Sequence, residues 1–174
     1  PKYVGDPLNA VRIFNEKSVD ELMVLDIEAT AQGAGPNFDL IADIASECFM
    51  PMSYGGAVAS LQHAAAILTS GVEKVVMNTA FVKSPNVIAD CACEFGSQAV
   101  VVSMDFKRSL LGQYALHGRA GGKGDPVTMA RRAEDLGAGE LLLTSVDREG
   151  TGKGYDLDLI RKVSNAVNIP VIAN

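Results

Sequence analysis

The feature that most constrains the fold of this chain is an internal repeat with an offset of 119 residues. The segment 5–51 aligns without a gap with the segment 124–170, and the tripeptides GDP and DLI recur in one register. The identical pairs include Gly5/Gly124, Asp6/Asp125, Pro7/Pro126, Glu21/Glu140, Gly33/Gly152, Gly35/Gly154 and Pro51/Pro170. A repeat of this kind predicts that the two segments adopt the same local structure.

Strand-like and helix-like segments alternate along the chain. Apolar runs predict strands at 21–27, 49–54, 73–80, 99–108, 140–147 and 169–174. Helical periodicity and capping residues predict helices at 7–20, 37–48, 60–71, 84–96, 125–139 and 155–167. The segment 28–36 is predicted to be a loop, and 110–124 an excursion, as in a hairpin. Its GGKG end is predicted to be a flexible loop, for which closure over a ligand stays open. This alternation indicates a parallel α/β architecture with right-handed crossovers.

The length of the repeat selects a barrel over an open sheet. Four β/α units per repeat give eight strands in a pair of repeats, which is the closed (β/α)₈ barrel. Two repeats require about 238 residues, but the chain has 174. We therefore expect one domain over 1–174, an incomplete (β/α)₈ TIM barrel truncated at both ends that holds strands 2 to 7.

The run 99–108 (AVVVSMDFKR) is the predicted central strand, and it leads into Asp105. Its β-branched apolar residues suit a strand that is buried on both faces of a parallel sheet. An aspartate at the carboxyl end of such a strand lies where α/β proteins place their chemistry. Asp105 is therefore the predicted acid/base residue.

Other polar or small residues follow the predicted strands and should share that edge with Asp105. They are Asp26, Gly55, Gly56, Asn78, Thr79, Thr144, Ser145 and Asp147. Backbone N–H groups after a glycine pair, with donors from Asn78 and Thr79, can hold a phosphate. A tight turn explains the glycine pair equally well, so both interpretations stay open.

A second pattern marks the opposite ends of the strands. Glu21, Lys74 and Glu140 each stand immediately before an apolar run. Three charges at one mouth of a barrel predict a salt-bridged ring, and the alternative is three separately solvated residues.

Composition excludes several functional classes. A net charge of −6 argues against nucleic acid as a partner, and no apolar span is long enough to enter a membrane. Three cysteines fit a reducing, cytoplasmic location, and neither Cys91–Cys93 nor the histidines His63 and His117 complete a metal site. We expect no metal and no cofactor.

The motifs YGGAV, KVVMNTAFVKSPN, EFGSQAVVVSMDFKR, LGAGELLLTSVDREGTGKGYD and IPVIAN together resemble one family over essentially the whole chain. That family is the cyclase subunit of imidazole glycerol phosphate synthase, from histidine biosynthesis. NAVRIFNEK and SECFMPMSYGG are more similar to a paralogous branch, which is associated with amidino modification of cell-surface sugars.

The resemblance implies a lyase that takes ammonia from a glutaminase partner and uses it to cleave and cyclise a bisphosphorylated aminoimidazole ribonucleotide. Asp105 matches one of two catalytic aspartates, and the other, on strand 1, has its place before Pro1. Ala57 departs from the family's third glycine after strand 3. The matching binding residues are Gly55, Gly56, Asn78 and Thr79 for one phosphate, with Thr144, Ser145 and Asp147 facing the substrate. The matching residues of the ammonia gate are Glu21, Lys74 and Glu140.

Two alternatives remain beside the cyclase. One is a catalytically inactive, self-associating barrel piece with residual phosphate binding, and the other is a different phosphate-binding barrel enzyme such as an isomerase. Because a six-strand piece exposes two apolar edges, at 22–26 and 170–174, we expect a homo-oligomer in which copies cover each other's edges.

Overall fold

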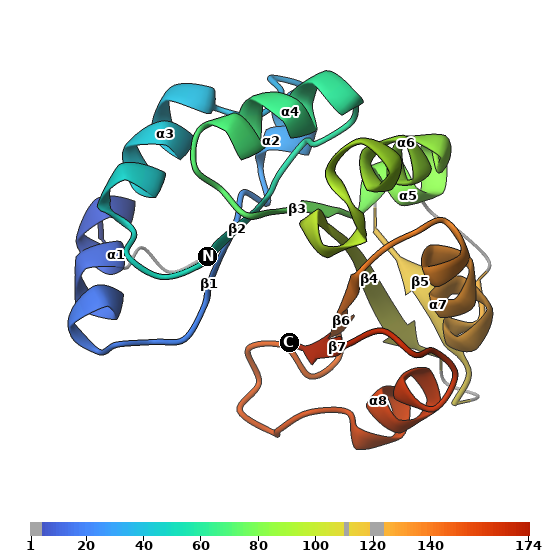
Figure 1. Ribbon diagram of the computed structural model, residues 1–174. Coiled ribbons are helices and arrows are strands. Elements are labelled where there is room, and N and C mark those ends of the chain that lie inside the picture. Colours follow the sequence, from blue (N-terminus) through green and yellow to red (C-terminus); the bar gives the residue numbers. More distant parts are fainter. Residues whose placement is uncertain (1–4, 110–111, 119–123) are drawn as a thin grey trace. The chain divides into compact units, whose positions relative to one another are not determined.

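The computed structural model describes residues 5–109, 112–118 and 124–174, which form two compact units divided between Val76 and Met77 (Figure 1). The tip of the predicted excursion, 110–111, and its glycine-rich end, 119–123, lie outside the described residues. Each unit consists of parallel β/α repeats. The architecture is therefore the predicted α/β fold and is consistent with a TIM barrel.

The first unit contains three parallel strands and the helices between them. Strand β1 (Leu22–Leu25) pairs with β2 (Met52–Gly55), which pairs with β3 (Lys74–Met77). Its helices are α1 (Pro7–Glu16), α2 (Ala29–Gln32), α3 (Phe38–Glu47) and α4 (Leu61–Thr69). Fully buried apolar side chains, among them Ile41, Ile44 and Ile67, form its core.

The second unit is built around β4 (Val100–Arg108), which pairs in parallel with β6 (Glu140–Ser145). Strand β6 pairs in parallel with β7 (Val171–Ala173), and β5 (Tyr114–His117) pairs antiparallel with β4. Its helices are α5 (Thr79–Lys83), α6 (Asn86–Phe95), α7 (Pro126–Asp135) and α8 (Leu157–Ser164), with the 3₁₀ turn η1 (Ser97–Ala99) before β4.

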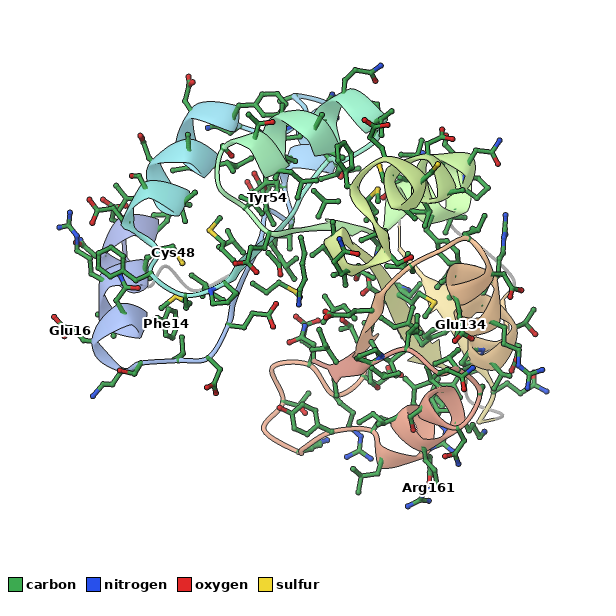
Figure 2. The ribbon with its side chains drawn as sticks, in the orientation of Figure 1. Phe14, Glu16, Cys48, Tyr54, Glu134 and Arg161 are labelled. Carbon is green, nitrogen blue, oxygen red and sulfur yellow. The ribbon has the colours of Figure 1, made fainter. Side chains whose placement is uncertain are left out.

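The predicted burial of the central strand is confirmed. Every residue of β4 from Val100 to Met104, and Phe106 as well, is buried. Figure 2 shows Tyr54 within the first unit, whereas Glu16 of the first unit and Arg161 of the second extend away from the ribbon.

Three local predictions need correction. The predicted loop 28–36 contains the short helix α2, and a second short helix, α5, follows β3 directly. Asp105 does not end its strand, because pairing with β5 extends β4 to Arg108. The first half of the excursion is the hairpin arm β5, as its position predicted.

The two units repeat several local geometries at the 119-residue offset. Asp6 and Asp125 cap α1 and α7, and each is followed by proline at the first helical position. Leu22 N donates to Pro51 O and Leu141 N donates to Pro170 O, both at 2.9 Å. Two further geometries match: the left-handed glycines Gly33/Gly152 and Gly35/Gly154, and the helix caps Asn37/Asp156.

Among the described residues, the longest helices have ten residues, and no helix is long and apolar enough to cross a membrane.

Candidate functional site

The site in the second unit is centred on Asp105, which is half-buried near the carboxyl end of β4. Its register partners are Thr144 on the parallel strand β6 and His117 on the antiparallel strand β5. Residues paired across strands have side chains on the same face of the sheet. The sheet therefore places the Asp105 carboxyl between the Thr144 hydroxyl and the His117 imidazole.

Hydrogen-bond donors hold the Asp105 carboxyl. The Asn78 amide donates to Asp105 Oδ2 at 3.0 Å, and the Thr144 hydroxyl also bonds to the carboxyl. Burial raises the pKa of Asp105 above its ordinary value of 3.8, while the bonds from Asn78 and Thr144 and the charge of His117 oppose that rise. A carboxyl under these opposed influences can both accept and release a proton.

Asn78 reaches Asp105 because it stands between β3 and α5. It occupies the cap position of α5, but its side chain makes no capping bond. The amide instead points to Asp105 and lies 3.4 Å from the Ser103 hydroxyl. Thr79, the next residue, begins α5 and is half-buried.

Thr144 and Ser145, both predicted to face the substrate, lie on opposite faces of β6, since successive residues of a strand alternate. Both are buried. Thr144 faces Asp105, whereas the Ser145 hydroxyl lies 3.4 Å from Asp156 Oδ2. Asp147, exposed beyond the strand, accepts a hydrogen bond from Arg108 N at 2.7 Å. It thereby joins the end of β4 to the loop after β6.

In the first unit, the Asp26 carboxylate stabilises the turn that follows β1. Its Oδ1 accepts from Glu28 N at 3.0 Å and from Ala29 N at 2.9 Å, where α2 begins. Asp26 N donates to Gly55 O at 2.7 Å. This carboxylate is therefore engaged in local structure.

The glycine pair at the end of β2 is required by packing. A Cβ on Gly55 would lie 2.8 Å from Val76 Cβ, and a Cβ on Gly56, whose φ is +151°, would lie 2.7 Å from Asp26 Cβ. Close packing is therefore one reason for both glycines, and phosphate binding by this pair stays a prediction. Ala57 has a φ of +51°, the left-handed conformation that favours glycine, which is the residue type of the family pattern at this position.

The charges at the other ends of the strands are partly brought together. Lys74 Nζ lies 2.7 Å from Glu21 Oε1, and the Ser53 hydroxyl donates to the same oxygen at 3.2 Å. The expected ion pair therefore exists within the first unit. Glu140 begins β6 in the second unit and is half-buried.

Two features were not predicted from the sequence. One is the pairing of His117 with Asp105. The other is a cavity of about 210 Å³ in the loop after β6. It is lined by Arg148, Glu149, Gly150, Gly152, Gly154, Tyr155 and Asn174. The alternate glycines of GTGKG signal this loop, because all three have left-handed φ values of 67°, 71° and 78°.

Comparison with known proteins agrees with the family resemblance described above. The histidine biosynthesis protein family matches residues 1–174. A Pseudomonas aeruginosa protein with the provisional name imidazole glycerol phosphate synthase subunit hisF2 is 47% identical, over 99% of this chain and 70% of its own length. Imidazole glycerol phosphate synthase subunit HisF of Alkaliphilus metalliredigens is 43% identical, with the same coverage. A Leptospira interrogans protein, provisionally named as the HisF subunit, is 44% identical over 98% of this chain and 68% of its own.

Proposed function

This chain belongs to the histidine biosynthesis protein family, and from that membership we propose that it is a cyclase of the imidazole glycerol phosphate synthase type. The proposed reaction is that of a lyase: ammonia attacks a bisphosphorylated aminoimidazole ribonucleotide, which is cleaved and cyclised to imidazole glycerol phosphate. The observation that supports it best is the half-buried Asp105 carboxyl held by Asn78 and Thr144.

Asp105 is the proposed general base. Asn78 and Thr144 donate to its oxygens, so they favour the carboxylate, which accepts a proton. Ring closure with loss of a leaving group needs one proton acceptor and one donor on opposite sides of the substrate. The resemblance implies two catalytic aspartates, so the complementary role is proposed for the strand-1 aspartate.

The phosphates of the substrate require backbone N–H groups and side-chain donors. For one phosphate we propose Gly55, Gly56 and Thr79, with Asn78 shared between phosphate and Asp105. The cavity after β6 is smaller than the roughly 300–1,000 Å³ of pockets that enclose a drug-sized ligand, so it suits a group of phosphate size. Arg148 on its wall supports binding of an anion there.

Ammonia is proposed to enter at the other ends of the strands. The Glu21–Lys74 ion pair, with Glu140 as a further member, would form the gate. A glutaminase subunit would dock at this end and supply the ammonia. The shared geometries at the 119-residue offset support a barrel built from two half-barrels.

The test is ammonia-dependent turnover of the aminoimidazole ribonucleotide by the intact protein, with excess ammonium salt at mildly alkaline pH. Asp105→Asn is expected to lower turnover on the order of 10²–10⁴-fold, the usual contribution of a general acid or base. Asp158→Asn makes the same chemical change on exposed α8 and should leave turnover unchanged.

Turnover that is insensitive to Asp105→Asn contradicts the assignment of the base. No turnover from a folded sample with bound phosphate would instead support the inactive, phosphate-binding barrel.

A further inference from the structure

The antiparallel arm β5 brings a second titratable group to the site. His117, the last residue of β5, is the register partner of Asp105. Directly opposed residues of antiparallel strands have Cβ atoms about 4.5–5.5 Å apart and share one face. The imidazole of His117 therefore lies on the face of the sheet that carries the Asp105 carboxyl.

His117 is more exposed to solvent than Asp105, so it can connect the Asp105 carboxyl with solvent. Asp105 is half-buried, whereas His117 is exposed. A half-buried base must return each proton it accepts before the next turnover. An exposed imidazole beside it offers a route, because histidine gains and loses protons near neutral pH.

The electrostatic coupling is specific to this pair. The charge of His117 lowers the pKa of Asp105 and so opposes the effect of burial. Lys107 stands two residues further along β4 on the same face, opposite Ala115, and is not among the groups that shift Asp105. Asp147 also lies near this end of β4 and accepts from Arg108 N.

Helix α7, which packs against β5, carries charged residues that are engaged elsewhere. Arg131 donates to Ala166 O, Arg132 lies 5.7 Å from the centre of the Phe81 ring, and Glu134 accepts from Asn168 N. Asp135 ends the helix at the side that leads into β6. Asp105 is thus the carboxylate that the strand pairing brings to His117.

The opposite face of the hairpin explains why His117 is held in place. Tyr114 donates from its hydroxyl to Asp156 Oδ1 at 2.9 Å, and the Arg108 guanidinium lies 5.3 Å from the centre of the Tyr114 ring. These contacts fasten β5 to the start of α8. The register that opposes His117 to Asp105 is therefore fixed from the other side of the strand.

We propose that His117 is the proton-relay partner of Asp105 in the reaction proposed above. The proton that Asp105 has accepted passes from its carboxyl oxygen to one ring nitrogen of neutral His117. The other ring nitrogen releases its proton to water or buffer, so that the carboxylate and the neutral imidazole are both regenerated. His117 thus acts through Asp105 and does not itself need to touch the substrate.

The first test does not depend on activity. Carboxyl-labelled aspartate allows the titration of Asp105 to be followed by NMR, with Asp105→Asn to assign its signal. We expect the pKa of Asp105 to rise in His117→Gln, to stay near the original value in His117→Lys, and to remain unchanged in Lys107→Gln. An equal rise in Lys107→Gln and His117→Gln, or no rise in either, would overturn the pairing even if the protein is an active cyclase.

The second test separates relay from charge. In weakly buffered solution, turnover by His117→Gln and His117→Lys should fall on the order of tenfold, less than for a group at the reacting atoms. Added imidazole should restore turnover in both variants and leave Asp105→Asn unrestored. A His117→Lys protein with full turnover, or variants that imidazole does not restore, would contradict the relay. Loss of the Asp105→Asn effect itself would instead remove the proposed base.

Discussion

Two opposed effects act on the pKa of the Asp105 carboxyl. Burial favours its neutral form, and the donors Asn78 and Thr144 favour its ionised form. The balance leaves the pKa of the folded state raised above 3.8. A group with a raised pKa in the folded state contributes stability that is fully present below the unfolded pKa. That stability is lost as the pH rises through the folded pKa.

Asp105→Asn is therefore expected to stabilise the protein at neutral pH while it lowers turnover. The neutral amide avoids the cost of a half-buried charge. Urea unfolding at a series of pH values from 3 to 7 should show a free energy of unfolding that falls less with rising pH in the variant. A variant less stable than the original protein at pH 7 would show that Asn78 and Thr144 outweigh burial.

Sequence reasoning at this scale identified Asp105 and the edge that it shares with Asn78 and Thr144. It did not identify the partner of each side chain, because Asn78 and Asp105 lie 27 positions apart. His117 stood alone in the sequence, and its significance depends on the register of the hairpin. Pairing register is set by tertiary structure, which local patterns do not show.

At the scale of elements, the antiparallel pairing of β5 with β4 supports the site. Tyr114 fastens it to α8, since its hydroxyl bonds to both oxygens of Asp156, the residue that caps that helix. Lys162 Nζ lies 5.3 Å from the centre of the Tyr114 ring. Burial, and then the bond and charge of Asp156, raise the pKa of Tyr114 to about 12.

Tyr114→Phe is expected to lower the free energy of unfolding by about 1–3 kcal/mol, because a buried carboxylate loses a donor. The tyrosine contribution is complete below pH 10 and is lost as the pH rises toward 12, so the difference between variant and original should shrink in that interval. Chemical unfolding at pH 8 and at pH 11 measures both effects.

Tyr155→Phe is the matched control, because Tyr155 is exposed in the loop before α8. It should change stability little at either pH. An equal effect of the two substitutions would contradict the fastening role of Tyr114.

Regular elements were predictable from periodicity and caps, as Asp6–Pro7 and Asp125–Pro126 illustrate. The helices α2 and α5 were missed because four or five residues are too few to show a helical period. The extension of β4 to Arg108 was missed because the exposed charges Lys107 and Arg108 resemble a strand end. An antiparallel partner, rather than apolar character, keeps them in the strand.

At the scale of the whole molecule, burial is uneven among strands. Strands β2 and β4 are largely buried, whereas β1 has half-buried residues and an exposed Leu25, and β7 is half-buried throughout. Among the described residues, the pairings of β1 and β7 are with β2 and β6, respectively. Apolar edges of this kind favour pairing with another chain.

We predict that the polypeptide of residues 1–174, prepared by itself, associates with itself through these strand edges. Light scattering at micromolar concentration should give a mass above 18.3 kDa. Leu25→Lys places a charge on the β1 edge and should shift the mass downward, while Lys17→Glu, a charge change beyond α1, should not. A monodisperse monomer would contradict the prediction.

The alternation of strands and helices identified the α/β class from the sequence. The strand order could be inferred because parallel β/α units connect neighbours. How copies associate has no such local signal.

The segments 28–36 and 147–155, which the 119-residue offset aligns, show which features the two copies of the repeat share. Both contain left-handed glycines at matching positions, and each is followed by a side chain that caps the next helix. At other positions of the two aligned segments the residues differ: Ala29 and Pro36 correspond to Arg148 and Tyr155, which line the cavity. The shared positions therefore specify the backbone, and the positions that differ decide which side chains each segment presents.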